Sequence, residues 1–116
     1  MREIKTDLFA YSEPDCRILR CVTTNGIVKK NGELTMGAGI ALAANKKYPG
    51  LARGLGKLVA ESGNQVYIIH DLDVASFPTK HNWKDNSDIK LIEKSARELA
   101  KMSYDYDVVL LTRPGC

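Results

Sequence analysis

The sequence has few of the features that define specialised protein classes. It has three cysteines, an odd number, and neither Cys16 nor Cys21 lies near a histidine or a second cysteine pair. These features argue against a disulfide framework and against a zinc site. No apolar run approaches the roughly 20 residues that span a bilayer, and the N-terminal residues lack the apolar stretch of a signal peptide. We therefore expect a cytoplasmic protein with reduced thiols, no metal, no cofactor and no membrane partner.

Aromatic residues and strong charge are also scarce. Aromatics make up 7% of the chain, too few for a surface that stacks on nucleic-acid bases. The formal net charge is +3, and its basic residues include the pairs Lys29-Lys30 and Lys46-Lys47. Such pairs are typical of a solvated surface, although the mild positive charge is compatible with an anionic ligand. A nucleic-acid-binding α/β domain, whose affinity would fall steeply with salt, is left as a remote alternative.

The 116 residues fit one domain, and strand-like and helix-like segments alternate, which favours an α/β fold. Strands are expected at 2–6, 18–24, 66–69, 74–77 and 108–112, and helices at 38–48, 51–61 and 88–103. The strand segments are apolar and β-branched, typical of parallel strands buried on both faces, and Cys21 should lie in the core. The polar stretch 25–35 has turn signals at Asn25-Gly26 and Asn31-Gly32, and predicts an exposed loop or a short hairpin.

Two helices carry specific expectations. Gly54 and Gly56 weaken the prediction of the second helix. Ser87 is the expected N-cap of the third helix. One apolar face of that helix is predicted from helical spacing. It comprises Ile89, Ile92, Ala96 and Leu99.

The most informative segment is Met36-Gly37-Ala38-Gly39-Ile40-Ala41, which predicts a glycine-rich loop opening a helix. Glycines let the backbone approach phosphates closely, and the unpaired N–H groups and dipole of the first helical turn attract an anion. Glycines placed there for packing alone are the alternative. A dinucleotide fingerprint does not fit, because Leu42 occupies its third glycine position, and a Walker loop's Gly-Lys-Ser or Gly-Lys-Thr is absent. We expect this segment to hold the diphosphate of a nucleotide-like ligand.

Asn25, a loop and then the glycine-rich segment 36–41 resemble the ligand-binding signature of macro domains, which bind ADP-ribose. Other pieces agree in order: Lys5-Thr6-Asp7-Leu8-Phe9, Phe77-Pro78-Thr79-Lys80 and Thr112-Arg113-Pro114-Gly115-Cys116. The resemblance covers essentially the whole chain and is nearest to the branch of terminal ADP-ribose protein glycohydrolases and DNA ADP-ribosylglycohydrolase antitoxins. It implies a three-layer α/β/α sandwich with a mixed central sheet.

The resemblance also implies residue roles. Asp7 would accept a hydrogen bond from the adenine amino group, near the backbone N–H of Leu8, and Asn25 would lie by the distal ribose. On the residues alone, Asp7 reads equally well as a turn residue and Asn25 as part of an Asn-Gly turn. The diphosphate and distal ribose would be held by Met36, Gly37, Ala38, Gly39, Ile40 and Ala41, and by a second glycine-rich loop that starts with Pro114, Gly115 and Cys116.

Lys80 is the catalytic candidate. In the glycohydrolase branch this lysine attacks the anomeric carbon of the distal ribose, and an acidic residue in the second glycine-rich loop helps to resolve the adduct. A lysine nucleophile must be neutral, which requires desolvation or a cationic neighbour. The alternative is a solvated surface lysine. His81 is interpreted as a loop residue.

The sequence departs from the family pattern in two places. A polar insertion at 27–34 either covers the ligand, contacts a macromolecular substrate or is a tolerated surface insertion. The chain also stops at Cys116, so we expect a single macro-like domain over 1–116 that is truncated before the end of the second glycine-rich loop and incomplete at its C-terminus. Asp105 and Asp107 precede the last strand and do not replace the missing acid.

The leading hypothesis is a domain that binds ADP-ribose and, in the full-length protein, hydrolyses it from an acidic side chain, a nucleobase or an O-acyl ester. The expected partner is ADP-ribose or an ADP-ribosylated macromolecule, with nucleic acid involved only if ADP-ribosylated DNA is the substrate. Two alternatives use the same pocket. One is a reader that binds without chemistry, and the other is a phosphatase that acts on ADP-ribose 1″-phosphate.

Overall fold

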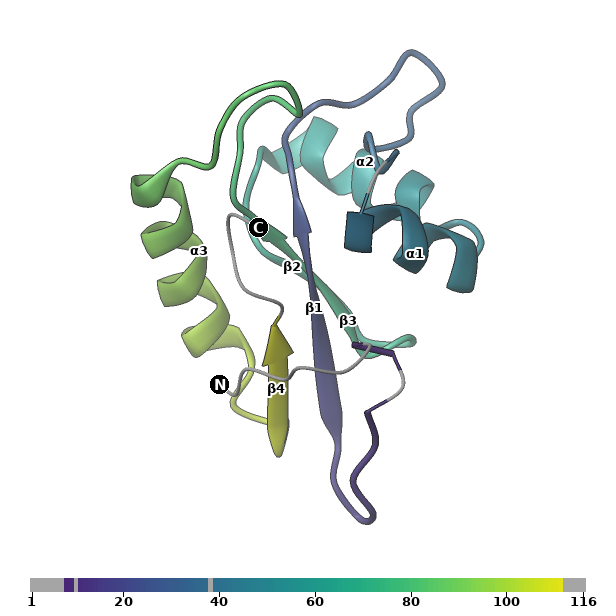
Figure 1. The fold of residues 1–116 in the computed structure, drawn as a ribbon, viewed down its shortest axis with the longest axis vertical. Coiled ribbons are helices and arrows are strands. Elements are labelled where there is room, and N and C mark those ends of the chain that lie inside the picture. Colours follow the sequence, from purple (N-terminus) through teal and green to yellow (C-terminus); the bar gives the residue numbers. More distant parts are fainter. Residues whose placement is uncertain (1–7, 10, 38, 112–116) are drawn as a thin grey trace.

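The computed structural model describes residues 8–9, 11–37 and 39–111 (Figure 1). Its elements are β1 (Ile18–Thr24), α1 (Gly39–Lys47), α2 (Leu51–Ser62), β2 (Tyr67–Ile69), β3 (Val74–Pro78), α3 (Ile89–Met102) and β4 (Val108–Leu111). They follow the ranges expected from the sequence closely, and the expected strand at 2–6 lies outside the described residues. No helix in the described ranges is long and apolar enough to cross a membrane.

The four strands form one mixed sheet in the order β2-β3-β1-β4. β1 lies in parallel between β3 and β4, and β2 pairs with β3 in the antiparallel direction. The three parallel strands β1, β3 and β4 are mostly buried, which agrees with the prediction of parallel strands buried on both faces. The residues of β2, which pairs only with β3 among the described strands, are half-buried.

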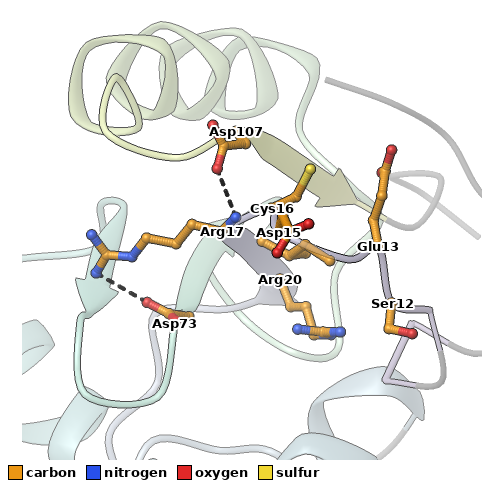
Figure 2. A pocket seen from close by; sticks show the side chains of 9 residues that line it. Ser12, Glu13, Asp15, Cys16, Arg17, Arg20, Asp73 and Asp107 are labelled. Atoms are coloured by element: carbon orange, nitrogen blue, oxygen red, sulfur yellow. Dashed lines mark hydrogen bonds and ion pairs between the residues drawn. The ribbon is translucent and has the colours of Figure 1, made fainter.

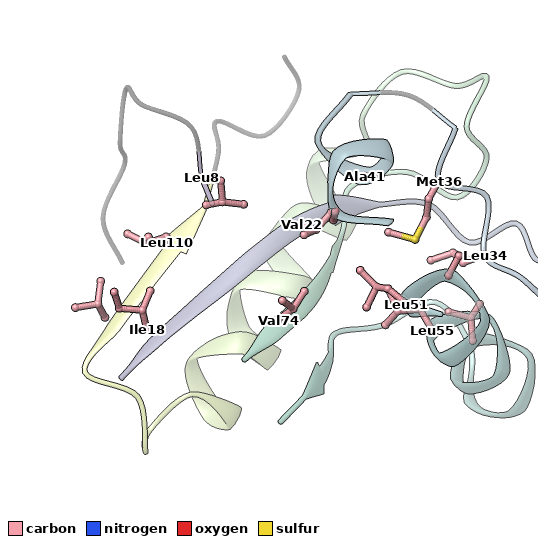
Figure 3. Packing of buried hydrophobic residues seen from close by; sticks show 14 residues of the cluster. Leu8, Ile18, Val22, Leu34, Met36, Ala41, Leu51, Leu55, Val74 and Leu110 are labelled. Carbon is pink, nitrogen blue, oxygen red and sulfur yellow. The ribbon is translucent and has the colours of Figure 1, made fainter. Parts of the chain in front are cut away.

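Helices cover both faces of the sheet, so the expected three-layer α/β/α sandwich is confirmed (Figure 1). Side chains alternate between the faces along each strand. Ile18 and Val22 of β1 face the layer of α1 and α2 (Figure 3), whereas Leu19 and Cys21 face α3. Cys21 is fully buried, as expected. Burial raises the pKa of its thiol to about 12, which keeps it protonated and unreactive.

The start of α3 differs from the prediction. Asp88, and not Ser87, is the N-cap, since its carboxylate accepts hydrogen bonds from the N–H groups of Lys90 and Leu91 at 2.9 and 3.4 Å. Ile89 is 69% exposed, so its assignment to the buried face was wrong. The fully buried positions of α3 are Leu91, Ser95 and Leu99. A helix turns by about 100° per residue, so this stripe leaves Ile89 on its flank.

The cap makes α3 sensitive to acid. Partial desolvation acts to raise the pKa of Asp88, but hydrogen bonds from the Leu91 and Lys90 N–H groups and from His81 outweigh it and lower the pKa. A carboxyl with a lowered folded-state pKa stabilises the fold fully above its unfolded pKa of about 3.9, and this contribution is lost as the pH falls through the folded-state value. We expect Asp88→Ala to lower the melting temperature at pH 7 and to have little effect at pH 2. Thermal unfolding at both pH values tests this, and an equal loss at both would contradict it.

The polar insertion forms a short hairpin that packs on α2. Val28 and Leu34 form an isolated antiparallel bridge, and the Leu34 N–H donates to the carbonyl of Ala52 in α2 at 2.8 Å. Leu34 is fully buried. The hairpin lies so close to α2 that a Cβ at Gly56 would be 2.0 Å from the carbonyl oxygen of Gly32. The insertion is therefore part of the core packing, and Gly56 is required for its contact with α2.

Candidate functional site

The candidate site lies at the carboxyl ends of the parallel strands. β1, β3 and β4 run in the same direction, so their last residues lie along one edge of the sheet. Thr24 pairs with Pro78, which places Asn25 beside Thr79 and brings Lys80 to the same edge. In open α/β sheets, ligands bind in the crevice outside the carboxyl ends of the strands. The topology therefore gathers candidate residues that are far apart in the sequence.

Hydrogen bonds join the segments that follow β1 and β3. The Thr79 N–H donates to the Thr24 carbonyl and the Gly26 N–H donates to the His81 carbonyl, both at 3.1 Å. The Asp88 N–H donates to the Thr79 carbonyl at 2.8 Å and links the same segment to the start of α3. The backbone around Lys80 is thus held on both sides by neighbouring elements.

Asn25 is buried, with 9% of its surface exposed, and its side chain organises the turn after β1. Its Oδ1 accepts from the Ile27 N–H and its Nδ2 donates to the Thr35 carbonyl, both at 3.0 Å. Asn25 therefore has the role in a turn that was one of the two roles expected from the sequence. One amide hydrogen is left for another acceptor, because an Asn NH₂ group carries two.

The glycine-rich segment does open a helix. α1 begins at Gly39, whose φ of 59° lies in the left-handed region that favours glycine. Gly37 and Gly39 are exposed, and nothing lies within 4 Å of the position that a Cβ would take at either residue. On the other side, Met36 and Ala41 are buried against the core, near Val22 of β1 (Figure 3). The segment is thus anchored to the core through Met36 and Ala41, and its glycine backbone is open to solvent.

The same end of β1 carries an unused polar group. Thr24 is 5% exposed, and its Oγ1 is buried without a hydrogen-bond partner among the described residues. Strand alternation places this side chain on the face of Val22, the face that α1 covers. Most buried hydroxyls have a partner, so an unpaired one is a position that a ligand or a water molecule can complete.

Arg20, which the sequence reasoning did not single out, fixes the N-terminal segment. It is a half-buried charged residue within a mostly apolar strand. An arginine in such a strand was the sequence feature that could have identified it. Its Nε donates to the Leu8 carbonyl at 3.2 Å and its Nη2 donates to the Tyr11 carbonyl. Leu8 itself is 1% exposed and belongs to the core. Of the remaining predicted site residues, Asp7, Ala38, Pro114, Gly115 and Cys116 lie outside the described residues.

Lys80 is half-buried and has no ion-pair partner within the described ranges. Its neighbour His81 contacts the N-cap of α3 instead, with 3.2 Å between His81 Nε2 and Asp88 Oδ2. His81 is thus engaged by the start of α3.

A separate hollow of about 590 Å³ lies at the opposite edge, where the strands begin (Figure 2). Arg17 holds this edge together. Its backbone N–H donates to Asp107 at 2.7 Å, its guanidinium pairs with Asp73 and Asp105 at 3.3 Å, and its Cζ lies 4.5 Å from the centre of the Tyr106 ring. These contacts tie the start of β1 to the residues just before β3 and β4, so we interpret the cluster as structural. Asp105 and Asp107 thus lie at the far end of β4 from the edge that carries Lys80.

In the described part of the chain, no group of three or more His, Cys, Asp or Glu residues is placed to hold a metal ion. The polar groups that the described residues place at the carboxyl edge include the Asn25 amide, the Thr24 hydroxyl, the N–H groups of the first turn of α1 and Lys80. This donor set suits a ligand with phosphates and sugar hydroxyls.

Comparison with solved structures shows the fold. The macrodomain of Thermus aquaticus DarG has a TM-score of 0.77 at 19% identity, with 99% of this chain and 77% of that chain covered. The macrodomain of Mycobacterium tuberculosis DarG has a TM-score of 0.66 at 21% identity, with 93% and 72% covered. Thermosipho africanus DarTG, solved in complex with ADP-ribose, has a TM-score of 0.68 at 19% identity, with 93% and 31% covered.

No protein-family model and no curated protein matches the sequence. The structural likeness nevertheless confirms the resemblance at the level of the fold: the chain has the fold of a macrodomain.

Proposed function

We propose that this chain, with its macrodomain fold, binds ADP-ribose at the carboxyl edge of β1, β3 and β4 and releases ADP-ribose from modified macromolecules through Lys80. The observation that carries the proposal is that Asn25, which follows β1, and Lys80, which follows β3, lie at one sheet edge, and that Asn25 is bonded to Thr35 just before the glycine-rich segment. The structure of Thermosipho africanus DarTG, which shares this fold, contains ADP-ribose.

The binding half of the proposal rests on the start of α1. The first N–H groups of this helix have no partners within the helix, and its first turn carries no acidic residue that would repel a diphosphate. The exposed glycines Gly37 and Gly39 leave room for the phosphates to approach the backbone. With Ala38, Ile40 and Ala41 they would form the diphosphate cradle, and Met36 would support it from the core.

The other contacts of the ligand are proposed from the family resemblance. Asn25 would contact the distal ribose with its remaining amide hydrogen. Asp7 and the backbone of Leu8 would bind the adenine, next to the segment that Arg20 fixes. Pro114, Gly115 and Cys116 would contribute to the opposite side of the diphosphate.

The chemical half of the proposal assigns Lys80 as the nucleophile. Its neutral amine would attack the anomeric carbon of the distal ribose, and the bond from that carbon to the substrate's oxygen or nitrogen would break with proton transfer to the leaving group. Water would then cleave the lysine adduct and free ADP-ribose. The support for this role is the place of Lys80 in the fold: it follows β3 at the sheet edge where Asn25 follows β1.

Binding should discriminate strongly for ADP-ribose. We expect calorimetric titration to show ADP-ribose binding at least tenfold more tightly than AMP, ATP or NAD, because only ADP-ribose presents the diphosphate together with a free distal ribose. Equal binding of all four, or none, would remove the proposed function.

Two assays separate the enzyme from the alternatives. ADP-ribose that binds without release from ADP-ribosylated protein or DNA would support a reader module. Phosphate liberated from ADP-ribose 1″-phosphate would support a phosphatase.

A further inference from the structure

We propose that Asn64 is a positioning residue that holds Lys80 against the end of β1, an inference that rests on the proposed function of Lys80. Asn64 directly follows Gly63, the C-cap of α2, whose φ of 95° turns the chain towards β2. No sequence motif points to this residue. Its contacts place it where three separate segments meet.

The first contact is with the nucleophile's own backbone. Asn64 Nδ2 donates a hydrogen bond to the Lys80 carbonyl at 3.0 Å. The flanking residues Thr79 and His81 are bonded to the backbone of Thr24 and Gly26, so the bond from Asn64 completes the attachment at the central residue. Together these bonds fix the Cα from which the lysine side chain extends.

The second contact is with Gly26 at the end of β1. A Cβ at this glycine would lie 2.9 Å from both Cγ and Nδ2 of Asn64, closer than such atoms approach. The Asn64 amide thus packs closely against the backbone of Gly26. A side chain at position 26 would push the amide away from the Lys80 carbonyl.

The amide orientation is fixed, because only Nδ2 can donate to a carbonyl oxygen. As a result Asn64 Oδ1 is buried and has no partner among the described residues. A buried acceptor without a partner destabilises a fold, so stability alone does not favour Asn at this position. What Asn64 provides instead is a hydrogen-bond donor to the Lys80 carbonyl from the segment that follows α2. A displacement of about 1 Å at a reacting group can cost about a hundredfold in rate, which makes such a support worthwhile in a catalytic segment.

The test compares Asn64→Ala and Gly26→Ala with the wild-type protein. Asn64→Ala removes the donor, and Gly26→Ala displaces it while keeping the amide. Gln65→Ala is the matched control, because Gln65 is the adjacent residue and its side chain bonds to the Tyr67 hydroxyl and not to the lysine segment. Three quantities are measured: the single-turnover rate of ADP-ribose release, the Kd for ADP-ribose, and hydrogen exchange at the Gly26 and Thr79 amides.

We expect Asn64→Ala and Gly26→Ala to slow release at least tenfold while the Kd changes less than threefold, and we expect Asn64→Ala to speed exchange at the Thr79 amide at least tenfold. Gln65→Ala should leave all three at wild-type values. A general loss of stability would not produce this split between rate and affinity. Release by Asn64→Ala at the wild-type rate, or unchanged Thr79 exchange, would overturn the inference.

The two proposals fail in different ways. If the wild-type protein releases no ADP-ribose, the proposed hydrolysis fails and the role of Asn64 in the reaction fails with it. If the wild-type protein releases ADP-ribose and Lys80→Ala does not, yet Asn64→Ala behaves as the wild type, only the inference about Asn64 is wrong.

Discussion

Replacement of Lys80 by alanine is expected to reduce ADP-ribose release by at least about a thousandfold, a scale typical of the loss of a nucleophile. The affinity for free ADP-ribose should change little, because the proposed binding contacts come from the start of α1 and from Asn25. A factor of a thousand corresponds to about 4 kcal/mol of lost transition-state stabilisation. Single-turnover release from an ADP-ribosylated substrate and calorimetry with ADP-ribose measure the two effects separately.

Lys84→Ala is the matched control for this experiment. Lys84 lies in the same segment between β3 and α3 and is exposed, and its Nζ lies 5.9 Å from the centre of the Trp83 ring. Removing this amine subtracts the same charge from the same segment without touching the proposed nucleophile. If both variants lose release equally, the effect is electrostatic, and if Lys80→Ala releases at the wild-type rate, the lysine mechanism is wrong.

Much of the fold could be predicted because the strands and helices obey local rules. The run Ile18–Thr24 is apolar and β-branched, and it is the central strand. Pro49-Gly50 ends the first helix as expected, and Gly50 has a φ of 92° before the second. The cap of α3 was misplaced by one residue, because Ser87 and Asp88 are both good caps and only the backbone path decides between them. Such choices depend on tertiary contacts.

The site was predictable where a residue's role follows from its neighbours in sequence, and not where it depends on distant ones. The glycine-rich segment predicted the start of a helix, and α1 begins within it at Gly39. Arg20 and Asn64 were missed, because their partners are backbone carbonyls at Leu8 and Lys80, which no sequence pattern encodes. The polar segment 27–34 was expected to cover the ligand, to contact a macromolecular substrate or to be a tolerated surface insertion, yet its last residue, Leu34, is fully buried.

Replacement of Gly56 by alanine is expected to destabilise the protein by about 2–4 kcal/mol, the sum of an overpacking cost and a lost hydrogen bond. The new Cβ would lie 2.0 Å from the Gly32 carbonyl oxygen and 2.7 Å from the Leu34 nitrogen. Both are backbone atoms, so the whole hairpin would have to move. That movement would break the bond from the Leu34 N–H to the Ala52 carbonyl. We expect the melting temperature to fall by roughly 10 °C or more.

Gly54→Ala is the control, because it makes the same substitution in the same helix with nothing within 4 Å of the new Cβ. Alanine has the higher helix propensity, so this variant should gain up to about 1 kcal/mol. The two glycines are two residues apart in α2, so opposite signs of the stability change point to the hairpin contact at Gly56. Denaturant unfolding of both variants gives the free energies directly. A neutral or stabilising Gly56→Ala would show that the hairpin does not pack on α2 as described, and the position of the glycine-rich segment that follows it would need to be revised.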